Sequence, residues 1–281
     1  MNMKNLRDKI VVITGAASGI GLEMARAFAA EGSKLTLADI NAAGLKEVKK
    51  EFESMGHPVY TQVVDVTKKE QVKDLCEKVY EKYGRTDVLC NNAGIGWAGK
   101  FEDWPLESWE QMININLWSV IYGCHYFYPR MIKQGGGGHI VNTASGAGLN
   151  PLPMMIAYCT TKFAVEGFTE TLRVEAALHG IGVTSVCPGI VKTNIFLTGK
   201  MFSSTAHTQA GDYFKKVDKF YARRNYTPDR VAKKVVKGVK KNIAVVRVCP
   251  ETYMGDLTHR LSRSFSIFQT RQVLKFMLDR T

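Results

Sequence analysis

The sequence predicts a single α/β domain built on a doubly wound parallel sheet of about seven strands, with helices on both faces. Short runs rich in β-branched residues alternate along the chain with longer runs of helical period, an order typical of parallel strands joined by crossover helices. The strand runs are almost continuously apolar, as expected where helices cover both faces of a sheet. With 281 residues, 45% of them hydrophobic, the chain is long enough to bury a full core.

Seven runs have strand character, and six longer stretches between them have helical period. The expected strands are Ile10–Ile13, Leu35–Ala38, Val59–Val64, Val88–Cys90, His139–Asn142, Val183–Val186 and Ala244–Val248. The expected helices lie near residues 19–31, 42–55, 68–83, 106–133, 155–179 and 228–241. Right-handed crossovers between successive parallel strands would place these helices on the two faces of the sheet.

Two segments fall outside this alternation. Residues 189–227 have no clear period, and a connection of that length in a compact domain is usually functional, so we expect a substrate lid there. Residues 251–281 place Leu257, Leu261, Phe265 and Phe268 at helical spacing, with Arg260, Arg263, Arg271 and Lys275 between them. We therefore expect one domain over residues 1–250 and a basic, amphipathic C-terminal helical extension over residues 251–281.

The formal net charge of +12 is concentrated at one end of the chain. Residues 1–214 hold 21 basic and 21 acidic residues, whereas residues 215–281 hold 17 basic and 5 acidic residues. A basic segment of this kind can face nucleic acid, an anionic membrane, an anionic substrate or only solvent. No nucleic-acid recognition motif accompanies the charge, so we expect no nucleic-acid partner.

Cysteine use and the N-terminal residues predict a cytoplasmic protein. The six cysteines stand well apart and form no C-x-x-C pair, which suits a reducing compartment. No apolar stretch long enough for export follows the charged residues at the N-terminus. The uncharged run at residues 114–129 is too short and too polar to cross a bilayer.

A glycine-rich turn joins the first expected strand to the first expected helix. Residues 14–21 read Thr-Gly-Ala-Ala-Ser-Gly-Ile-Gly. Glycines at such a turn let the backbone approach a pyrophosphate, which the helix N-terminus then stabilises. The alternative is a glycine-rich turn that binds no ligand. The cofactor contacts expected here are Gly15, Ser18, Gly19, Ile20 and Gly21.

Asp39 ends the second expected strand, 18 residues after Gly21. A carboxylate at this place accepts hydrogen bonds from the adenosine ribose of NAD, and it would repel the 2′-phosphate of NADP. Asp39 therefore favours NAD. A second interpretation, compatible with the first, is that Asp39 caps the helix that follows Asn41.

In these motifs the chain resembles the short-chain dehydrogenases/reductases, in their simple single-domain branch with a Rossmann-type fold. The T-G-x-x-x-G-I-G sequence is the fingerprint of that branch. Two further motifs follow in order, Asp65-Val66 after the third strand and Asn91-Asn92-Ala93-Gly94 after the fourth. The resemblance implies that Asp65 and Val66 contact the adenine and that Asn92, Ala93 and Gly94 line the cofactor.

The resemblance also assigns the catalytic residues. Tyr158 and Lys162 share one face of an expected helix, and Ser145 lies 13 residues before Tyr158. A Tyr-x-x-x-Lys pair is a weak signal alone, but with Ser145 and the glycine motif it matches the family's catalytic set. Asn116 matches a fourth member, and Asn114 is the weaker candidate. The structural alternatives are a buried tyrosine, a solvated lysine and a serine that caps a loop.

These residue types suit hydride transfer coupled to proton transfer at an alcohol or ketone oxygen. A phenol has an unperturbed pKa of about 10, and nearby positive charge stabilises its anion. We therefore expect Tyr158 to be the acid/base, Lys162 to tune it and to donate to the nicotinamide ribose, and Ser145 to hold the reacting oxygen. The family implies that Asn116 holds a water that links Lys162 to solvent.

A further family motif follows the sixth strand. It comprises Pro188, Gly189, Ile190 and Thr193, and the resemblance places it beside the nicotinamide, with Ile190 and Thr193 meeting the carboxamide. One departure is Thr161, where serine is more usual. Cys159 points about 100° away from Tyr158 on a helix, so we expect a packed thiol rather than a nucleophile, and we expect no metal site.

The segments expected around the substrate carry large apolar residues. These are Trp97, Leu149, Met154, Met155, Phe196, Leu197, Met201 and Phe202. We expect an NAD-dependent oxidoreductase of a lipophilic secondary alcohol or ketone, unless these residues only pack the lid and the substrate is small. Two other functions remain open: a 3-oxoacyl thioester reductase (CoA or acyl carrier protein) that uses NADPH, and a non-catalytic dinucleotide sensor or scaffold.

The basic C-terminal segment has three possible roles, and we expect all of them to lie outside the chemistry. It can be a solvated, packed appendage, an interfacial helix on anionic lipid that gives peripheral membrane contact, or a contact for an anionic handle such as a CoA phosphate. Family likeness suggests a homodimer or homotetramer built on the helices at 106–133 and 155–179.

Overall fold

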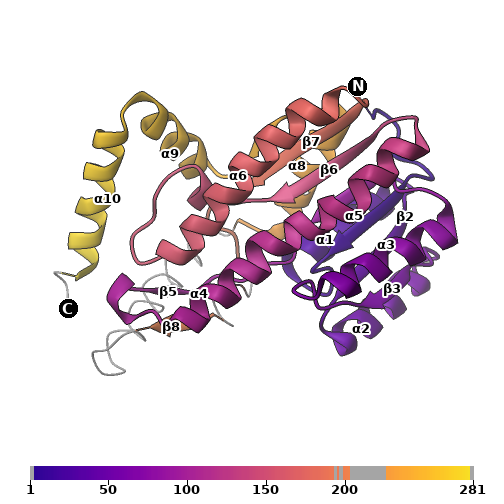
Figure 1. Ribbon diagram of the computed structural model, residues 1–281, viewed down its shortest axis with the longest axis horizontal. Coiled ribbons are helices and arrows are strands. Elements are labelled where there is room, and N and C mark those ends of the chain that lie inside the picture. Colours follow the sequence, from indigo (N-terminus) through magenta and orange to yellow (C-terminus); the bar gives the residue numbers. More distant parts are fainter. Residues whose placement is uncertain (1–2, 193–194, 196–198, 203–225, 279–281) are drawn as a thin grey trace.

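Seven parallel strands form one sheet in the order β3-β2-β1-β4-β6-β7-β9 (Figure 1). The computed structural model describes residues 3–192, 195, 199–202 and 226–278. The strands are β1 Ile10–Thr14, β2 Lys34–Asp39, β3 Tyr60–Val63, β4 Val88–Asn91, β6 Gly138–Thr143, β7 Ile181–Cys187 and β9 Val245–Arg247. This confirms the predicted parallel sheet. The strand order reverses between β1 and β4, and ligands of such sheets bind beyond the carboxyl ends of the strands at that point.

Helices cover both faces of the sheet, as the doubly wound prediction requires. One face is covered by α1 Gly19–Ala30, α2 Ala42–Ser54 and α8 Pro228–Lys241, and the other by α3 Lys69–Tyr83, α5 Ser119–Gln134 and α6 Ile156–Ala177. Strand β1 shows the division within one element. Val11 and Ile13 pack into the first core, and Ile10 and Val12 pack into the second, because successive side chains of a strand point to opposite faces.

The single helix expected near residues 106–133 is three segments. Helix α4 spans Leu106–Ile113, a π-helical turn spans Asn114–Trp118, and α5 follows at Ser119. Single π turns within helices are often found at functional sites. Hydrophobic period could not reveal this turn, because the side chain of Asn116 within it bonds the distant backbone of Ile95.

The C-terminal extension is two helices rather than one. Helix α9 spans Pro250–Leu261, the chain turns at Ser262, and α10 spans Arg263–Leu278. Both project from one end of the molecule (Figure 1). Near this end, β5 Ala98–Gly99 pairs with β8 Met201–Phe202. This pairing joins residues 201–202, which lie within the expected lid, to the segment that follows β4. Among the described residues, no helix is long and apolar enough to cross a membrane.

A glycine allows α5 to lie close to the sheet. A Cβ on Gly123 would come within 2.0 Å of Asn91 Oδ1. Asn91 is buried and cannot give way easily, because its Nδ2 donates to Asn142 Oδ1 at 2.9 Å. Asn142 in turn donates to Thr169 Oγ1 on α6 at 3.1 Å. These buried amides therefore link β4, β6 and α6 beside the place where α5 packs.

We predict that Gly123→Ala lowers the free energy of unfolding by about 1–3 kcal/mol, the usual cost of overpacking a core. Gly167→Ala is the matched control. Gly167 lies within α6 and a Cβ there would meet open space, so alanine should raise stability by up to about 1 kcal/mol. Urea unfolding of both variants measures the difference. Equal effects in the two variants would contradict the packing argument.

His139 is a buried titratable group within β6. Its Nε2 lies 2.7 Å from Thr184 Oγ1 on β7. Burial, together with the nearby positive charge of Arg173, lowers the pKa of His139 to about 3. The unfolded chain takes up a proton at this histidine below about pH 6.5, whereas the folded protein does not until about pH 3. The stability that neutral His139 contributes is therefore present above about pH 6.5 and is lost as the pH falls.

We predict that the free energy of unfolding falls by about 2 kcal/mol as the pH is lowered from about 7 to about 5, because His139 takes up a proton in the unfolded chain only. Substitution His139→Gln should flatten this pH dependence, because glutamine has no proton to gain. His125 is exposed on α5, and His125→Gln should leave the slope as it is in the wild type. Urea unfolding at the two pH values tests this, and an unchanged slope in His139→Gln would refute it.

Candidate active site

A cleft of about 760 Å³ lies beyond the carboxyl ends of the strands. It runs from the glycine-rich turn after β1 to the catalytic candidates on α6. The predicted site residues that line it are Gly15, Ser18, Gly19, Ile20, Asp39, Asp65, Val66, Asn92, Ala93, Gly94, Ser145, Tyr158, Lys162, Pro188, Gly189 and Ile190. Gly21 and Asn116 do not line the cleft, and Thr193 lies outside the described residues.

The glycine turn is built by close backbone packing. Gly15 has φ +66°, and a Cβ on it would lie 2.8 Å from the Cα of Ala93. A Cβ on Gly21 would lie 2.0 Å from the carbonyl oxygen of Gly15. Gly21 therefore lets α1 pack against the turn, which differs from the cofactor contact predicted for it.

The N-terminus of α1 faces the cleft with free hydrogen-bonding capacity. Ser18 is the N-cap residue, its side chain makes no capping bond, and no acidic residue lies in the first turn. Such a terminus leaves backbone N–H groups and a positive helix-dipole end for an anion. Ser18, Gly19 and Ile20 line the cleft here, so this end fits the pyrophosphate of a dinucleotide.

Asp39 is held at the edge of the same end of the cleft. Its Oδ2 accepts from Ala17 N and its Oδ1 accepts from Asn41 N, both at 2.9 Å. The capping interpretation of Asp39 is wrong, because Asn41 is the N-cap of α2 and accepts from Gly44 N at 3.0 Å. Each carboxylate oxygen keeps a lone pair, so the oriented carboxylate can still accept from a ribose hydroxyl.

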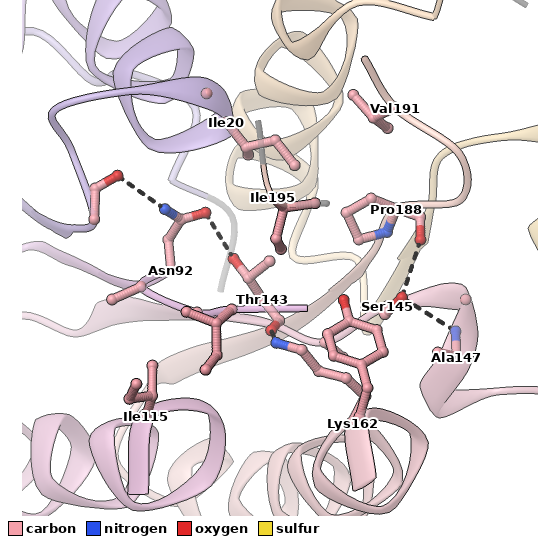
Figure 2. A pocket seen from close by; sticks show the side chains of 18 of the residues that line it. Ile20, Asn92, Ile115, Thr143, Ser145, Ala147, Lys162, Pro188, Val191 and Ile195 are labelled. Atoms are coloured by element: carbon pink, nitrogen blue, oxygen red, sulfur yellow. Dashed lines mark hydrogen bonds between the residues drawn. The ribbon is translucent and has the colours of Figure 1, made fainter. Parts of the chain in front are cut away.

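Asn92 joins three strand ends (Figure 2). Its Nδ2 donates to Thr14 O at 3.0 Å and to Gly15 O at 3.3 Å, and its Oδ1 accepts from Thr143 Oγ1 at 3.3 Å. Thr14 Oγ1 also accepts from Asn92 N at 3.0 Å and from Ala93 N at 3.2 Å. Thr14 and Thr143 are thus positioning residues that sequence reasoning did not identify, since their partners lie far away in the chain.

Ser145 and Tyr158 lie together at the other end of the cleft. Ser145 follows β6, accepts from Ala147 N at 3.1 Å, and lies 3.5 Å from Pro188 O (Figure 2). Tyr158 lies on the first turns of α6 and is 6% exposed. Burial raises the pKa of Tyr158 to about 12, and a hydrogen bond with Ser145 acts in the opposite direction. The phenol is therefore protonated at neutral pH.

Lys162 lies one turn further along α6 and is 3% exposed. Its Nζ donates to Thr143 O at 2.8 Å and lies 5.7 Å from the centre of the Tyr158 ring. Burial lowers the pKa of Lys162 to about 8. The side chain is therefore still mainly a cation at neutral pH, and its charge lies near the phenol.

Asn116 supports the site from behind. It is fully buried, its Oδ1 accepts from Ile95 N, and its Nδ2 donates to Ile95 O, both at 2.9 Å. Its side chain thereby holds the segment that follows Gly94. The water-holding role that the resemblance implies for Asn116 stays a prediction.

Most of the apolar residues expected around the substrate lie elsewhere. Of the described ones, only Met155 lines the cleft. Trp97 and Phe202 do not line the cleft but pack with Trp104 in a hydrophobic cluster that also contains Met155 and Tyr158, and Leu149 lies in the core on the α6 side of the sheet. Phe196 and Leu197 lie outside the described residues. The direction of a loop side chain depends on tertiary packing, so spacing could not assign it. Other apolar residues line the cleft instead, among them Ile95, Ile115, Leu152, Val191 and Ile195.

The first turn of α9 closes part of the cleft, which the sequence did not predict. Glu251, Thr252 and Gly255 line it. Glu251 Oε1 accepts from Ile190 N at 2.9 Å, the backbone group expected to meet the nicotinamide carboxamide. Helix α9 therefore borders the cleft, but no basic residue of the described C-terminal segment lines it, and the expectation that this charge lies outside the chemistry stays a prediction. Proline at the first helical position and glutamate in the first turn marked the helix start, but no local signal gave its position.

No cluster of three His, Cys, Asp or Glu side chains that could hold a metal ion occurs among the residues the structure describes.

Comparison with known proteins agrees with this geometry. The sequence model of the short chain dehydrogenase family matches residues 9–200. The probable oxidoreductase EphD of Mycobacterium tuberculosis is 41% identical over 247 residues, which cover 88% of this chain and 42% of that protein. The chain thus spans less than half the length of that relative. An uncharacterized oxidoreductase of Staphylococcus saprophyticus is 39% identical over 236 residues, covering 83% of this chain and 90% of that protein.

Among solved structures, a short-chain dehydrogenase/reductase from Burkholderia phymatum in complex with NAD superimposes with a TM-score of 0.85 at 27% identity. The match covers 94% of this chain and 96% of that chain. Fold, cleft and sequence likeness together lead to one conclusion: the chain belongs to the short-chain dehydrogenase family of oxidoreductases.

Proposed function

We propose that the protein interconverts a lipophilic secondary alcohol and a ketone, with NAD as hydride carrier. One observation carries the proposal. A single cleft joins the N-terminus of α1 and Asp39 at one end to Ser145, Tyr158 and Lys162 at the other. The first end suits a dinucleotide with a free ribose 2′-hydroxyl, and the second suits proton transfer at an oxygen.

The residues of the chain handle the proton. When bound, the nicotinamide accepts or gives the hydride at the carbinol carbon. In ketone reduction, Tyr158 donates its proton to the oxygen as the C–H bond forms. In alcohol oxidation, Tyr158 takes the hydroxyl proton as the hydride leaves the same carbon. Burial keeps the phenol protonated, so the isolated site is ready for reduction, whereas oxidation needs positive charge nearby to stabilise the phenolate.

Ser145 and Lys162 position the reaction. Ser145 would hydrogen-bond the substrate oxygen and hold it near Tyr158. Lys162 supplies the nearby positive charge, and its contact with Thr143 O fixes where that charge lies. Asn116 keeps the segment after β4 in place and thereby shapes the wall of the cleft beside Lys162.

The wall of the cleft supports an apolar substrate. Near the catalytic residues it includes Ile95, Leu152, Met155 and Ile195. Apolar walls with a few polar groups are typical of sites for small hydrophobic ligands. The runner-up is a 3-oxoacyl thioester reductase that uses NADPH. The oriented carboxylate of Asp39 disfavours it, because a 2′-phosphate would meet a like charge.

We also propose a cytoplasmic homo-oligomer. All six cysteines are buried as free thiols, which supports a reducing compartment. Large apolar side chains in the π turn before α5 and on or just after α6, namely Trp118, Phe163, Val174 and Leu178, are exposed. They support a contact between copies of the chain through these two helices.

We predict that Tyr158→Phe lowers kcat at least about a hundredfold, since general acid–base catalysis contributes roughly 10²–10⁴-fold. NAD affinity, measured by calorimetry, should stay within a few fold because the ring remains in place. Tyr128 lies on α5 away from the cleft, and Tyr128→Phe is the control. Turnover of Tyr158→Phe at the wild-type rate would remove the catalytic assignment and favour a cofactor sensor or scaffold.

We predict that the wild type binds NADH more tightly than NADPH, and that Asp39→Ser narrows the ratio of the two affinities at least about tenfold by removing the like-charge contact. Asp65→Asn removes a carboxylate from the same cleft, away from the expected 2′-phosphate, and should leave the ratio unchanged. Titration of each variant with both cofactors measures this. A wild-type preference for NADPH would overturn the NAD assignment and favour the thioester reductase.

A further inference from the structure

The C-terminal helices α9 and α10 expose large apolar side chains that the fold does not use. On α9, Met254, Leu257 and Leu261 are 68%, 58% and 77% exposed. Their spacing places them on one stripe, opposite the buried Thr252 and Asp256. The inner side of α9 therefore belongs to the domain, and its outer side is an exposed apolar stripe.

Helix α10 is attached in the same one-sided way. Ser266 is buried, and its Oγ donates to Asn150 Oδ1. Thr270, one turn later, donates to Pro151 O at 3.4 Å. Phe268 lies on the opposite side of the helix from these anchors and Phe265 lies beside it, and both are at least half exposed. Attachment through two short hydroxyl side chains leaves the large aromatic ones outside.

The charges around these apolar residues all have one sign. Arg260, Arg263, Arg271 and Lys275 are exposed, and no acidic residue between 250 and 275 is exposed. The two acidic residues of this stretch point inward. Glu251 accepts from Ile190 N, and Asp256 pairs with Arg247 and Arg260. Arg263, Arg271 and Lys275 make no ion pair with a described residue.

We propose that the outer side of α9 and α10 is a docking surface for an anionic lipid bilayer. Exposed aromatic and aliphatic side chains interspersed with arginine and lysine match the interfacial region of such a membrane, where the apolar groups enter the acyl boundary and the cations meet the headgroups. A second copy of the chain fits this surface less well. A two-fold contact places the same patch on both sides, so it would bring these cations together with no exposed acid to pair them.

The position of α9 places the cleft close to the proposed membrane contact. The significance of this closeness rests on the proposed lipophilic substrate. Its inner residues Thr252 and Gly255 line the cleft, and its outer stripe would lie in the membrane interface. A helix with its side chains is about 10 Å across. The cleft would therefore stand about one helix away from the bilayer, close to where an apolar substrate dissolves.

Co-sedimentation of the full chain with vesicles tests the docking independently of catalysis. We expect binding to vesicles of phosphatidylcholine with phosphatidylserine at low salt, weaker binding at high salt, and little binding to phosphatidylcholine alone. The triple variant Arg263→Glu, Arg271→Glu, Lys275→Glu should lose at least about a hundredfold in partition coefficient. The variant Met254→Ser, Leu257→Ser, Leu261→Ser should lose a similar factor.

Matched controls carry the same changes elsewhere on the surface. Lys46→Glu, Lys69→Glu, Lys73→Glu reverses three exposed charges on α2 and α3, and Met55→Ser, Leu106→Ser changes exposed apolar residues just after α2 and at the start of α4. Both should bind vesicles within a few fold of the wild type. Thermal unfolding should show unchanged midpoints for all variants, since every replaced side chain is exposed.

Three results would overturn the docking proposal. The first is no binding of the wild type to anionic vesicles at low salt. The second is an equal loss in the test and control variants, which would make the effect one of general charge or hydrophobicity. The third is an oligomer that dissociates in the α9 variant while no variant binds vesicles, which would assign this surface to a second copy of the chain. Loss of catalysis with docking retained would instead refute only the proposed function.

Discussion

The side chain of Asn92 connects the two halves of the cleft, and the geometry of the site depends on this connection. Its amide nitrogen donates to the backbone of Thr14 and Gly15 at the end of β1, and its oxygen accepts from Thr143 at the end of β6. The carbonyl oxygen of Thr143 in turn accepts from Lys162. One chain of hydrogen bonds thus runs from the glycine turn to Lys162. The connections after β1 and β4 leave toward opposite faces of the sheet where the strand order reverses, and these hydrogen bonds tie the two sides of the cleft together.

Burial shifts the pKa values of Tyr158 and Lys162 on α6 in opposite directions. Desolvation penalises the charged form of each group, so it raises the pKa of Tyr158 to about 12 and lowers that of Lys162 to about 8. Both groups are thereby nearer to their neutral forms than they would be in water. Charge brought into the cleft shifts both groups, because a buried site screens it weakly. The proton chemistry is thus sensitive to what occupies the cleft.

The C-terminal helices extend the domain in two directions at once. The first turn of α9 reaches the cleft through Glu251 and Thr252, while Leu257 and Leu261 face outward. The basic residues of this end of the chain therefore fall into two groups, one bonded within the fold and one on the surface. Lys234 and Lys240 on α8 are tied into the fold through Val248 O and Glu31, whereas the cations of α10 remain on the surface.

The sequence by itself determined the order of strands and helices, the glycine turn, and the identity of Ser145, Tyr158 and Lys162. The first two are recorded locally, in hydrophobic period and in glycine spacing, whereas the three side chains were singled out because their motif resembles that of the family. Only the tertiary structure decided that Asn41 rather than Asp39 caps α2, that a π turn interrupts the helix at Asn116, that Trp97 and Phe202 do not line the cleft, and that α9 closes part of it. Each of these depends on contacts between residues distant in the chain or on the direction of a loop side chain. Period and spacing along the sequence contain no information about such contacts, so the fold had to bring the partners together before they could be assigned.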